Sequence, residues 1–77
     1  MDAKLNSIIA ETLRLPLEKV KDELEMSQVE YWDSLQHMNL IASLEQAFDA
    51  EFTFEEIVSM QNVAEIKRVL KSKGVEV

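Results

Sequence analysis

The sequence contains no cysteine, one proline and one glycine among its 77 residues. Without cysteine the chain has neither disulfides nor thiolate metal ligands, and a single histidine excludes a histidine-cluster metal site. Few helix breakers, together with frequent Leu, Glu, Ala and Lys, favour helices over strands. We therefore expect an all-α fold and a single domain over residues 1–77, because a chain this short builds only one small core.

Long apolar runs are missing as well. None approaches the roughly 20 residues that cross a bilayer, and the amphipathic, acid-containing start "MDAKLNSIIAET" lacks the apolar segment of a signal peptide. We expect a cytoplasmic monomer that does not insert into membranes. The net charge is −7, and the stretch from residue 22 to residue 66 has no Lys or Arg. Such acidity argues against nucleic-acid binding. It suits either a solvated surface or a docking face for basic partners.

Apolar spacing predicts three longer helices and one short helix. The first carries Leu5 and Ile9 and stops at Pro16. The others are expected at about 34–48, 54–60 and 63–73, the last ended by Gly74. The connection over residues 15–33 is expected to fold back over the core with its apolar side chains, Leu17 among them. One face of the helix at 34–48 is expected to carry Leu35, Met38, Ile41, Leu44 and Phe48, and Leu40 widens that stripe.

Helix starts are marked by capping boxes. In such a box a short polar side chain caps the helix, and the side chain three residues later bonds back to the backbone N–H of the capping residue. Three pairs have this spacing: Asp33 with Gln36, Thr53 with Glu56, and Asn62 with Glu65.

Ser34 is expected in the first turn of the second helix, just after its cap. Backbone N–H groups without helical partners and the positive end of the helix dipole meet there, and both stabilise phosphate. The hydroxyl could carry a phosphodiester. By position alone an ordinary serine at a helix start is the simpler interpretation.

The residues around Ser34 favour the first interpretation, a serine that carries a phosphodiester. "DSL" opens an amphipathic helix and is followed by "LEQAF", "TFEEI" and a last helix, while "LPLEKV" follows the first helix. In order and spacing, nearly the whole chain resembles the acyl carrier protein family. The resemblance implies a small four-helix bundle with a long first loop. It also implies that a phosphopantetheinyl transferase attaches 4′-phosphopantetheine to Ser34, so that acyl groups are held as thioesters by a carrier that is not an enzyme and binds no metal.

The resemblance also implies roles for the neighbours of Ser34. Asp33 caps the helix and takes part in the modification site, through the metal of the transferase. Leu35 is expected to be exposed and, with Met38, to contact partner enzymes, although both could instead belong to the core. Glu45 remains on the acidic face that meets acyl-transferring or acyl-activating enzymes with basic docking surfaces.

Trp32 departs from the family, whose fatty-acid carriers usually have a small residue there. It could form a hydrophobic staple with His37, or contact the arm, the cargo or a partner as an exposed hot spot. His37 is a tempting base for Ser34, but a hydrolase also needs an orienting group and an oxyanion hole, and neither is apparent. We expect His37 to be exposed and non-catalytic.

Three amides, Gln36, Asn39 and Gln46, stand where fatty-acid carriers commonly have acids. This pattern favours a stand-alone carrier of a specialised pathway, and acyl, polyketide and aminoacyl cargo all remain open. The alternative is an unmodified acidic helical interaction module. A calcium-binding helical protein is excluded, because no D-x-[DN]-x-[DN]-G loop with a closing Glu occurs.

Overall fold

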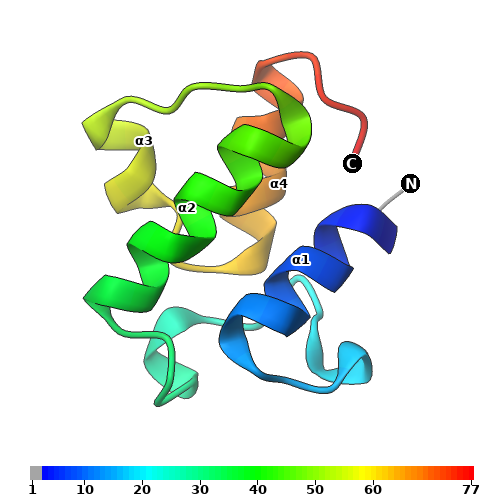
Figure 1. Ribbon diagram of the computed structural model, residues 1–77, viewed down its shortest axis with the longest axis vertical. Coiled ribbons are helices and arrows are strands. Elements are labelled where there is room, and N and C mark those ends of the chain that lie inside the picture. Colours follow the sequence, from blue (N-terminus) through cyan, green and yellow to red (C-terminus); the bar gives the residue numbers. More distant parts are fainter. Residues whose placement is uncertain (1–2) are drawn as a thin grey trace.

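The computed structural model describes residues 3–77. Its helices are α1 (Ala3–Leu13), α2 (Ser34–Phe48), α3 (Phe54–Ser59) and α4 (Val63–Ser72), and the long first loop contains the 3₁₀ turns η1 (Leu17–Lys19) and η2 (Met26–Gln28) (Figure 1). The prediction of three longer helices and one short helix with a long first loop is confirmed. None of the four α-helices has the length and apolar character to cross a membrane, as far as residues 3–77 are described.

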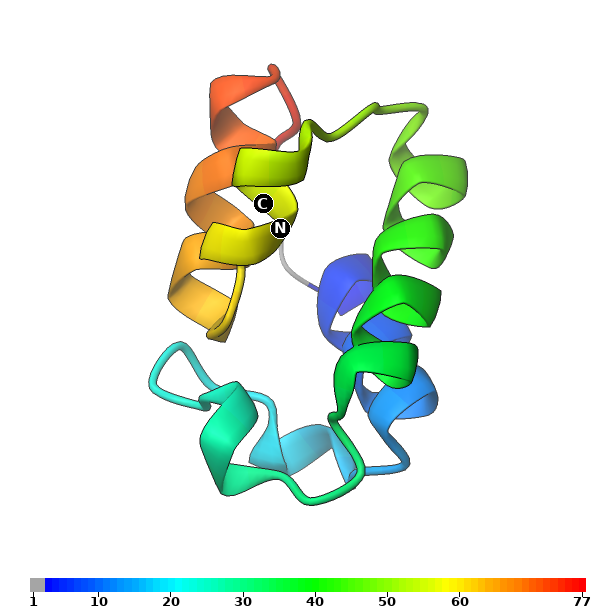
Figure 2. The same cartoon turned by 90° about the vertical axis from the view of Figure 1, so that its left-hand side faces the viewer.

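The four helices enclose one core. Figure 2 shows α3 and α4 on one side, α1 and α2 on the other, and the long loop closing the end between them. Each of the three longer helices contributes several side chains with little or no exposed surface. These are Leu5, Ile9 and Leu13 from α1, Leu40, Ile41 and Leu44 from α2, and Val63, Ile66, Val69 and Leu70 from α4.

The inward face of α2 differs from the predicted stripe at its start. Leu35 and Met38 are 67% and 51% exposed, whereas Leu40 is fully buried. At about 3.6 residues per turn, Leu35 and Leu40 point about 140° apart, so both cannot face the core. Phe48 is only partly buried. The alternative that places Leu35 and Met38 in the core is therefore wrong, and the exposure expected for Leu35 is confirmed.

The predicted caps are all present at the helix starts, but only one forms the full reciprocal pair. Side-chain oxygens of Asp33, Thr53 and Asn62 accept from the backbone N–H three residues on. The Glu56 side chain also accepts from the Thr53 N–H at 2.8 Å, which completes that box.

Residues in the left-handed conformation follow α1 and α4. Gly74, at φ 87°, follows α4, and the Val75 N–H returns to the Leu70 carbonyl at 3.1 Å. This is the Schellman arrangement, so the predicted stop at Gly74 is confirmed. Arg14, at φ 58°, plays the same part after α1, where the Leu15 N–H donates to the Ala10 carbonyl at 2.9 Å. A left-handed non-glycine residue is uncommon and fixes the direction in which the long loop departs.

Backbone hydrogen bonds fix the long loop to the start of α4. Met26 N–H donates to the Gln61 carbonyl at 2.7 Å, and Val63 N–H donates to the Leu24 carbonyl at 3.0 Å. Val20 and Val29 of the loop are buried, but Leu17 is 55% exposed, so its predicted place over the core is wrong. The loop is thus an integral part of the fold, and its last residues lead directly into Ser34.

Candidate functional site

Ser34 is the first residue of α2, and its side chain is exposed. Asp33 precedes it as the N-cap: its Oδ1 accepts from the Gln36 N–H at 2.9 Å, and its own N–H donates to the Tyr31 carbonyl at 3.0 Å. The first helical hydrogen bond runs from the His37 N–H to the Asp33 carbonyl at 2.8 Å. A helix start leaves four amides without helical partners, and among the residues that the structure describes those of Ser34 and Leu35 have no other acceptor and remain for an anion. A phosphodiester on Ser34 fits this positive, uncovered helix end.

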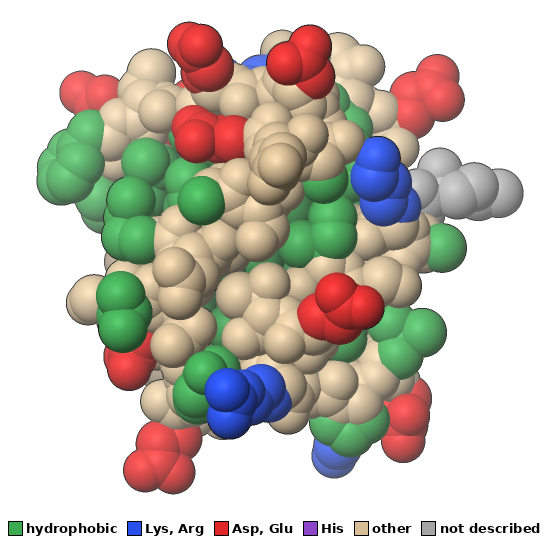
Figure 3. Space-filling model, viewed as in Figure 1, with side chains coloured by type: hydrophobic (Ala, Val, Ile, Leu, Met, Phe, Trp, Pro, Cys, Tyr) green, Lys and Arg blue, Asp and Glu red, His purple; other side chains and the backbone are tan. Residues whose placement is uncertain are grey.

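Exposed apolar side chains lie beside Ser34 on α2 and also on α3. Leu35 and Met38 come from α2, and α3 adds Phe54 and Val58, which are 77% and 48% exposed. Figure 3 shows hydrophobic side chains along the left edge of the molecule, where α3 and the start of α2 lie in Figure 1. Sequence analysis missed Phe54 and Val58. Their signal was the repeat of four residues that places both on one face of α3.

Trp32 and His37 form a buried pair under the first turn of α2. They are 2% and 7% exposed, the Trp32 Nε1–H donates to His37 Nδ1 at 3.0 Å, and the ring centroids are 6.0 Å apart. The expected pairing of the residue before the cap with the fourth helical residue is confirmed. The exposure expected for His37 is wrong. The interpretation of Trp32 as an exposed partner contact is also wrong, because its side chain lies in the core.

Burial of His37 is possible because both ring nitrogens have partners. Nδ1 accepts from Trp32, so the proton of the neutral ring is assigned to Nε2, which lies 2.8 Å from the Ile57 carbonyl oxygen and donates to it. One imidazole thus joins the loop, α2 and α3. A ring held in this way has no nitrogen left to take a proton from Ser34, so the Ser34–His37 hydrolase loses its base.

Glu45, expected on the acidic face, also braces the loop after α2. Its Oε2 accepts from the Phe52 N–H at 3.1 Å, and the side chain is half-buried. Of the three amides, Asn39 and Gln46 are exposed, and Asn39 Nδ2 donates to Gln36 Oε1 at 3.1 Å. A contact of Glu45 with partner proteins stays a prediction.

An ion pair connects α3 with the end of α4. Lys73 Nζ lies 2.9 Å from Glu56 Oε1, and the hydrogen bond from Lys73, with that from the Thr53 backbone, lowers the pKa of Glu56 below its ordinary 4.5. Within residues 3–77, no three carboxylate or imidazole side chains gather as a metal site would require.

Comparison with known families agrees with this geometry. A family model described as "Phosphopantetheine attachment site" matches residues 3–70. The chain belongs to this family. It is a carrier domain of the acyl carrier protein type, and the family is defined by covalent attachment of 4′-phosphopantetheine to a serine. The match includes every helix start described above and the whole long loop, but it ends before the Schellman turn at Gly74.

Proposed function

We propose that Ser34 is the attachment residue of this carrier domain and that acyl or related intermediates travel on its arm as thioesters. The observation that supports this is the exposed Ser34 hydroxyl at the start of α2, beside two amides with no helical partner. Of the six serines in the sequence, Ser34 alone begins an α-helix. Ser59 and Ser72 lie at helix C-terminal ends, where the dipole disfavours phosphate.

Modification would proceed by displacement at phosphorus. The Ser34 oxygen forms a bond to the pantetheine-bearing phosphorus of coenzyme A, the bond from that phosphorus to the bridging oxygen breaks, and adenosine 3′,5′-bisphosphate leaves. A base of the transferase takes the hydroxyl proton. Asp33 holds the first turn of α2 in place, and its carboxylate would meet the metal of the transferase.

The arm ends in a thiol, and a thioester on that thiol activates the acyl carbonyl for attack. The carrier supplies no catalytic group itself. Its flexible tether raises the local concentration of the cargo at each enzyme that docks. We infer that 77 residues act as one monomeric carrier domain in the cytoplasm.

Leu35 and Met38 would contact the phosphopantetheinyl transferase and the acyl-transferring or acyl-activating enzymes. Both are exposed next to Ser34, and exposed apolar side chains that gather on one face mark interaction sites. Glu45 and its acidic neighbours would add attraction to basic docking surfaces. We infer that the carrier works in a specialised pathway instead of primary fatty-acid synthesis, because Gln36, Asn39 and Gln46 are uncharged.

The test is an intact-mass measurement after incubation of the apo protein with coenzyme A and a broad-specificity phosphopantetheinyl transferase. Wild type should gain one phosphopantetheinyl group, Ser34→Ala none, and the matched control Ser27→Ala, a loop serine, should gain one. A wild type that gains nothing while a known carrier is modified in the same tube would contradict the proposal. It would favour the unmodified interaction module.

A further inference from the structure

Helix α3 turns its largest apolar side chains outward. The six residues of α3 include no fully buried side chain: Phe54 and Val58 are 77% and 48% exposed, and Ile57 packs only partly against the core. So short a helix is marginal by itself, since isolated helices below about 12–15 residues are barely stable in water. The position of α3 therefore depends strongly on the polar contacts at its two ends.

The two ends of α3 are held by different parts of the molecule. At its start, Glu56 completes the capping box with Thr53 and also pairs with Lys73 at the end of α4. At its other end, the Ile57 carbonyl accepts from His37 Nε2 at 2.8 Å. The last carbonyls of a helix have few helical partners, so the imidazole of α2 acts as a side-chain cap on the final turn of α3.

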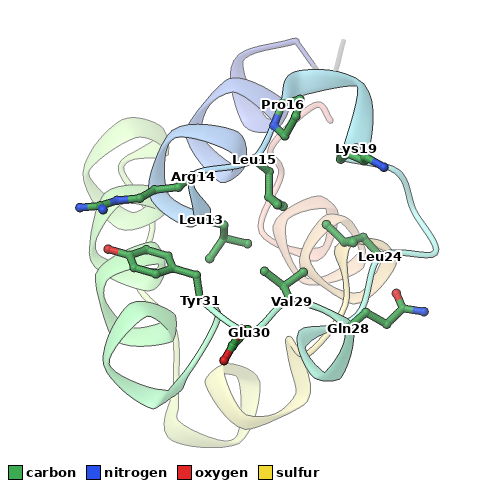
Figure 4. A pocket seen from close by; sticks show the side chains of 10 residues that line it. All are labelled: Leu13, Arg14, Leu15, Pro16, Lys19, Leu24, Gln28, Val29, Glu30 and Tyr31. Atoms are coloured by element: carbon green, nitrogen blue, oxygen red, sulfur yellow. The ribbon is translucent and has the colours of Figure 1, made fainter.

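The ring that caps α3 is itself held by the end of the long loop. Trp32 Nε1–H donates to His37 Nδ1 from within the core. The preceding residue, Tyr31, instead lines a groove of about 510 Å³ between the end of α1 and the loop (Figure 4). There the Arg14 guanidinium lies 4.8 Å from the Tyr31 ring centroid. Two consecutive aromatic residues thus fix the loop, and Trp32 orients the imidazole toward α3.

His37 is the fourth residue of α2, so its bond to Ile57 holds the last turn of α3 against the turn that begins at Ser34. Val58 follows Ile57 directly and belongs, with Phe54, to the exposed apolar face shared by α2 and α3 (Figure 3). We propose that His37 is a positioning residue for the modification of Ser34. Without touching coenzyme A or the transferase, it holds Phe54 and Val58 where the transferase meets them together with the serine. This inference rests on the proposed function.

A contact of this kind acts on binding and not on the chemical step. Side chains that meet the transferase away from the reacting phosphorus contribute equally to the ground state and the transition state, so their loss raises KM and leaves kcat unchanged. Displacement of α3 should raise the KM of the transferase for the apo protein about tenfold, or about 1.4 kcal/mol, because an exposed aromatic side chain at an interface can supply that much.

Two amide substitutions separate the bond to α3 from the rest of the ring. Glutamine carries an N–H as many bonds from Cβ as Nε2 of histidine and can donate to the Ile57 carbonyl. Asparagine reaches only as far as Nδ1, so it keeps an acceptor for Trp32 and loses α3. His37→Asn should raise KM about tenfold, whereas His37→Gln should stay within about twofold of wild type. Urea midpoints are expected to fall in both variants, so a rise in KM in one alone does not follow from lost stability.

A double-mutant cycle tests whether the effect passes through α3. Phe54→Ala/Val58→Ala should raise KM by itself, and His37→Asn should add little in that background, because the contacts it displaces are already gone. Leu17→Ala, at an exposed position of the long loop, is the matched control. In that background His37→Asn should keep its full effect. A purely structural role would give the same loss in every background.

The two proposals fail in different ways. A wild type that gains no phosphopantetheinyl mass overturns both attachment at Ser34 and positioning by His37. With wild type modified, positioning alone is overturned by equal KM values for His37→Asn and His37→Gln, by a fall in kcat at constant KM, or by an undiminished effect of His37→Asn in the Phe54→Ala/Val58→Ala background. These two surface substitutions leave the core intact, and an unchanged KM in them overturns positioning even if a His37 variant does not fold.

Discussion

The Trp32 indole donates to Nδ1 of His37 at 3.0 Å, inside the core and directly beneath the turn that presents Ser34. The other nitrogen of the same imidazole reaches the Ile57 carbonyl of α3 at 2.8 Å. The His37 ring therefore accepts one hydrogen bond and donates another, and together they fix the loop and α3 against α2. The turn of α2 that carries the exposed Ser34 is therefore fixed to the core.

Replacement of His37 by Leu should destabilise the fold by about 2–4 kcal/mol, because it leaves the buried Trp32 N–H without a partner and removes the side-chain hydrogen bond to the Ile57 carbonyl, which keeps only the Met60 N–H at 3.3 Å. Urea denaturation followed by circular dichroism measures this loss. Asn39→Leu, at an exposed position of the same helix, is the matched control and should change stability by less than about 0.5 kcal/mol. Equal midpoints for the two variants would show that the ring does not support the core.

Asp33 is expected to cap α2 and to take part in the modification of Ser34, and Asp33→Asn separates these two roles. Asparagine caps a helix about as well as aspartate, so stability should change by only a few tenths of a kcal/mol, whereas Asp33→Ala should cost about 1 kcal/mol. Single-turnover modification by the transferase should nevertheless slow in Asp33→Asn, which lacks the carboxylate. If Asp33→Asn is modified as fast as wild type, the aspartate serves only as a cap.

Leu44 and Phe48, both in the C-terminal half of α2, should respond differently to truncation. Leu44 is fully buried, so Leu44→Ala should cost about 2–5 kcal/mol. Phe48 is only partly buried, with Lys4 Nζ 5.1 Å from its ring centroid, and Phe48→Ala should cost less than the roughly 3–5 kcal/mol of a fully buried phenylalanine. Denaturant midpoints compare the two, and a larger loss at Phe48 would contradict the assignment of the inward face.

The Glu56–Lys73 pair should make stability depend on pH at the acidic end. Because the pKa of Glu56 is lowered in the fold from 4.5, its contribution is fully present above that value and is lost as pH falls through the folded pKa. Stability measured from pH 7 to pH 3 should therefore fall less steeply below about pH 4.5 in Glu56→Gln than in wild type. Glu55→Gln, exposed on the same helix, should keep the wild-type slope.

The amides of α2 should set the choice of partner. Single surface charge pairs are worth about 0–1 kcal/mol. Introducing three acids by Gln36→Asp, Asn39→Glu and Gln46→Glu should therefore raise the affinity for a basic partner by about tenfold. Transfer of malonyl groups to the holo protein by a fatty-acid transacylase should rise accordingly, and added salt should remove the gain. A wild type already as good as a fatty-acid carrier would argue against the specialised pathway.

Local sequence was sufficient to predict the helix starts and the position of Ser34. Caps and stops act within three or four residues, so Asp33, Thr53, Asn62 and Gly74 could be assigned without any tertiary contact. The resemblance through D-S-L then gave Ser34 its expected role.

What the sequence could not predict depends on partners distant along the chain. His37 is buried because a carbonyl 20 residues away accepts from it. The inward face of α2 was ambiguous because two overlapping sets of apolar residues both have helical spacing. The long loop lies against the bundle because its backbone groups bond to the start of α4, and backbone pairing of this kind leaves no pattern in the side chains.

The bonds from Leu24 and Met26 to the start of α4 also bear on the order of events during synthesis. Ser34 leaves the ribosome well before Gln61 and Val63. These two residues hold the loop that precedes Ser34 in the sequence. Contacts separated by more than 30 residues form only after the intervening chain has been closed into a loop. A nascent chain that stops short of α4 should therefore be a poor substrate for the transferase, and modification should wait for the complete domain.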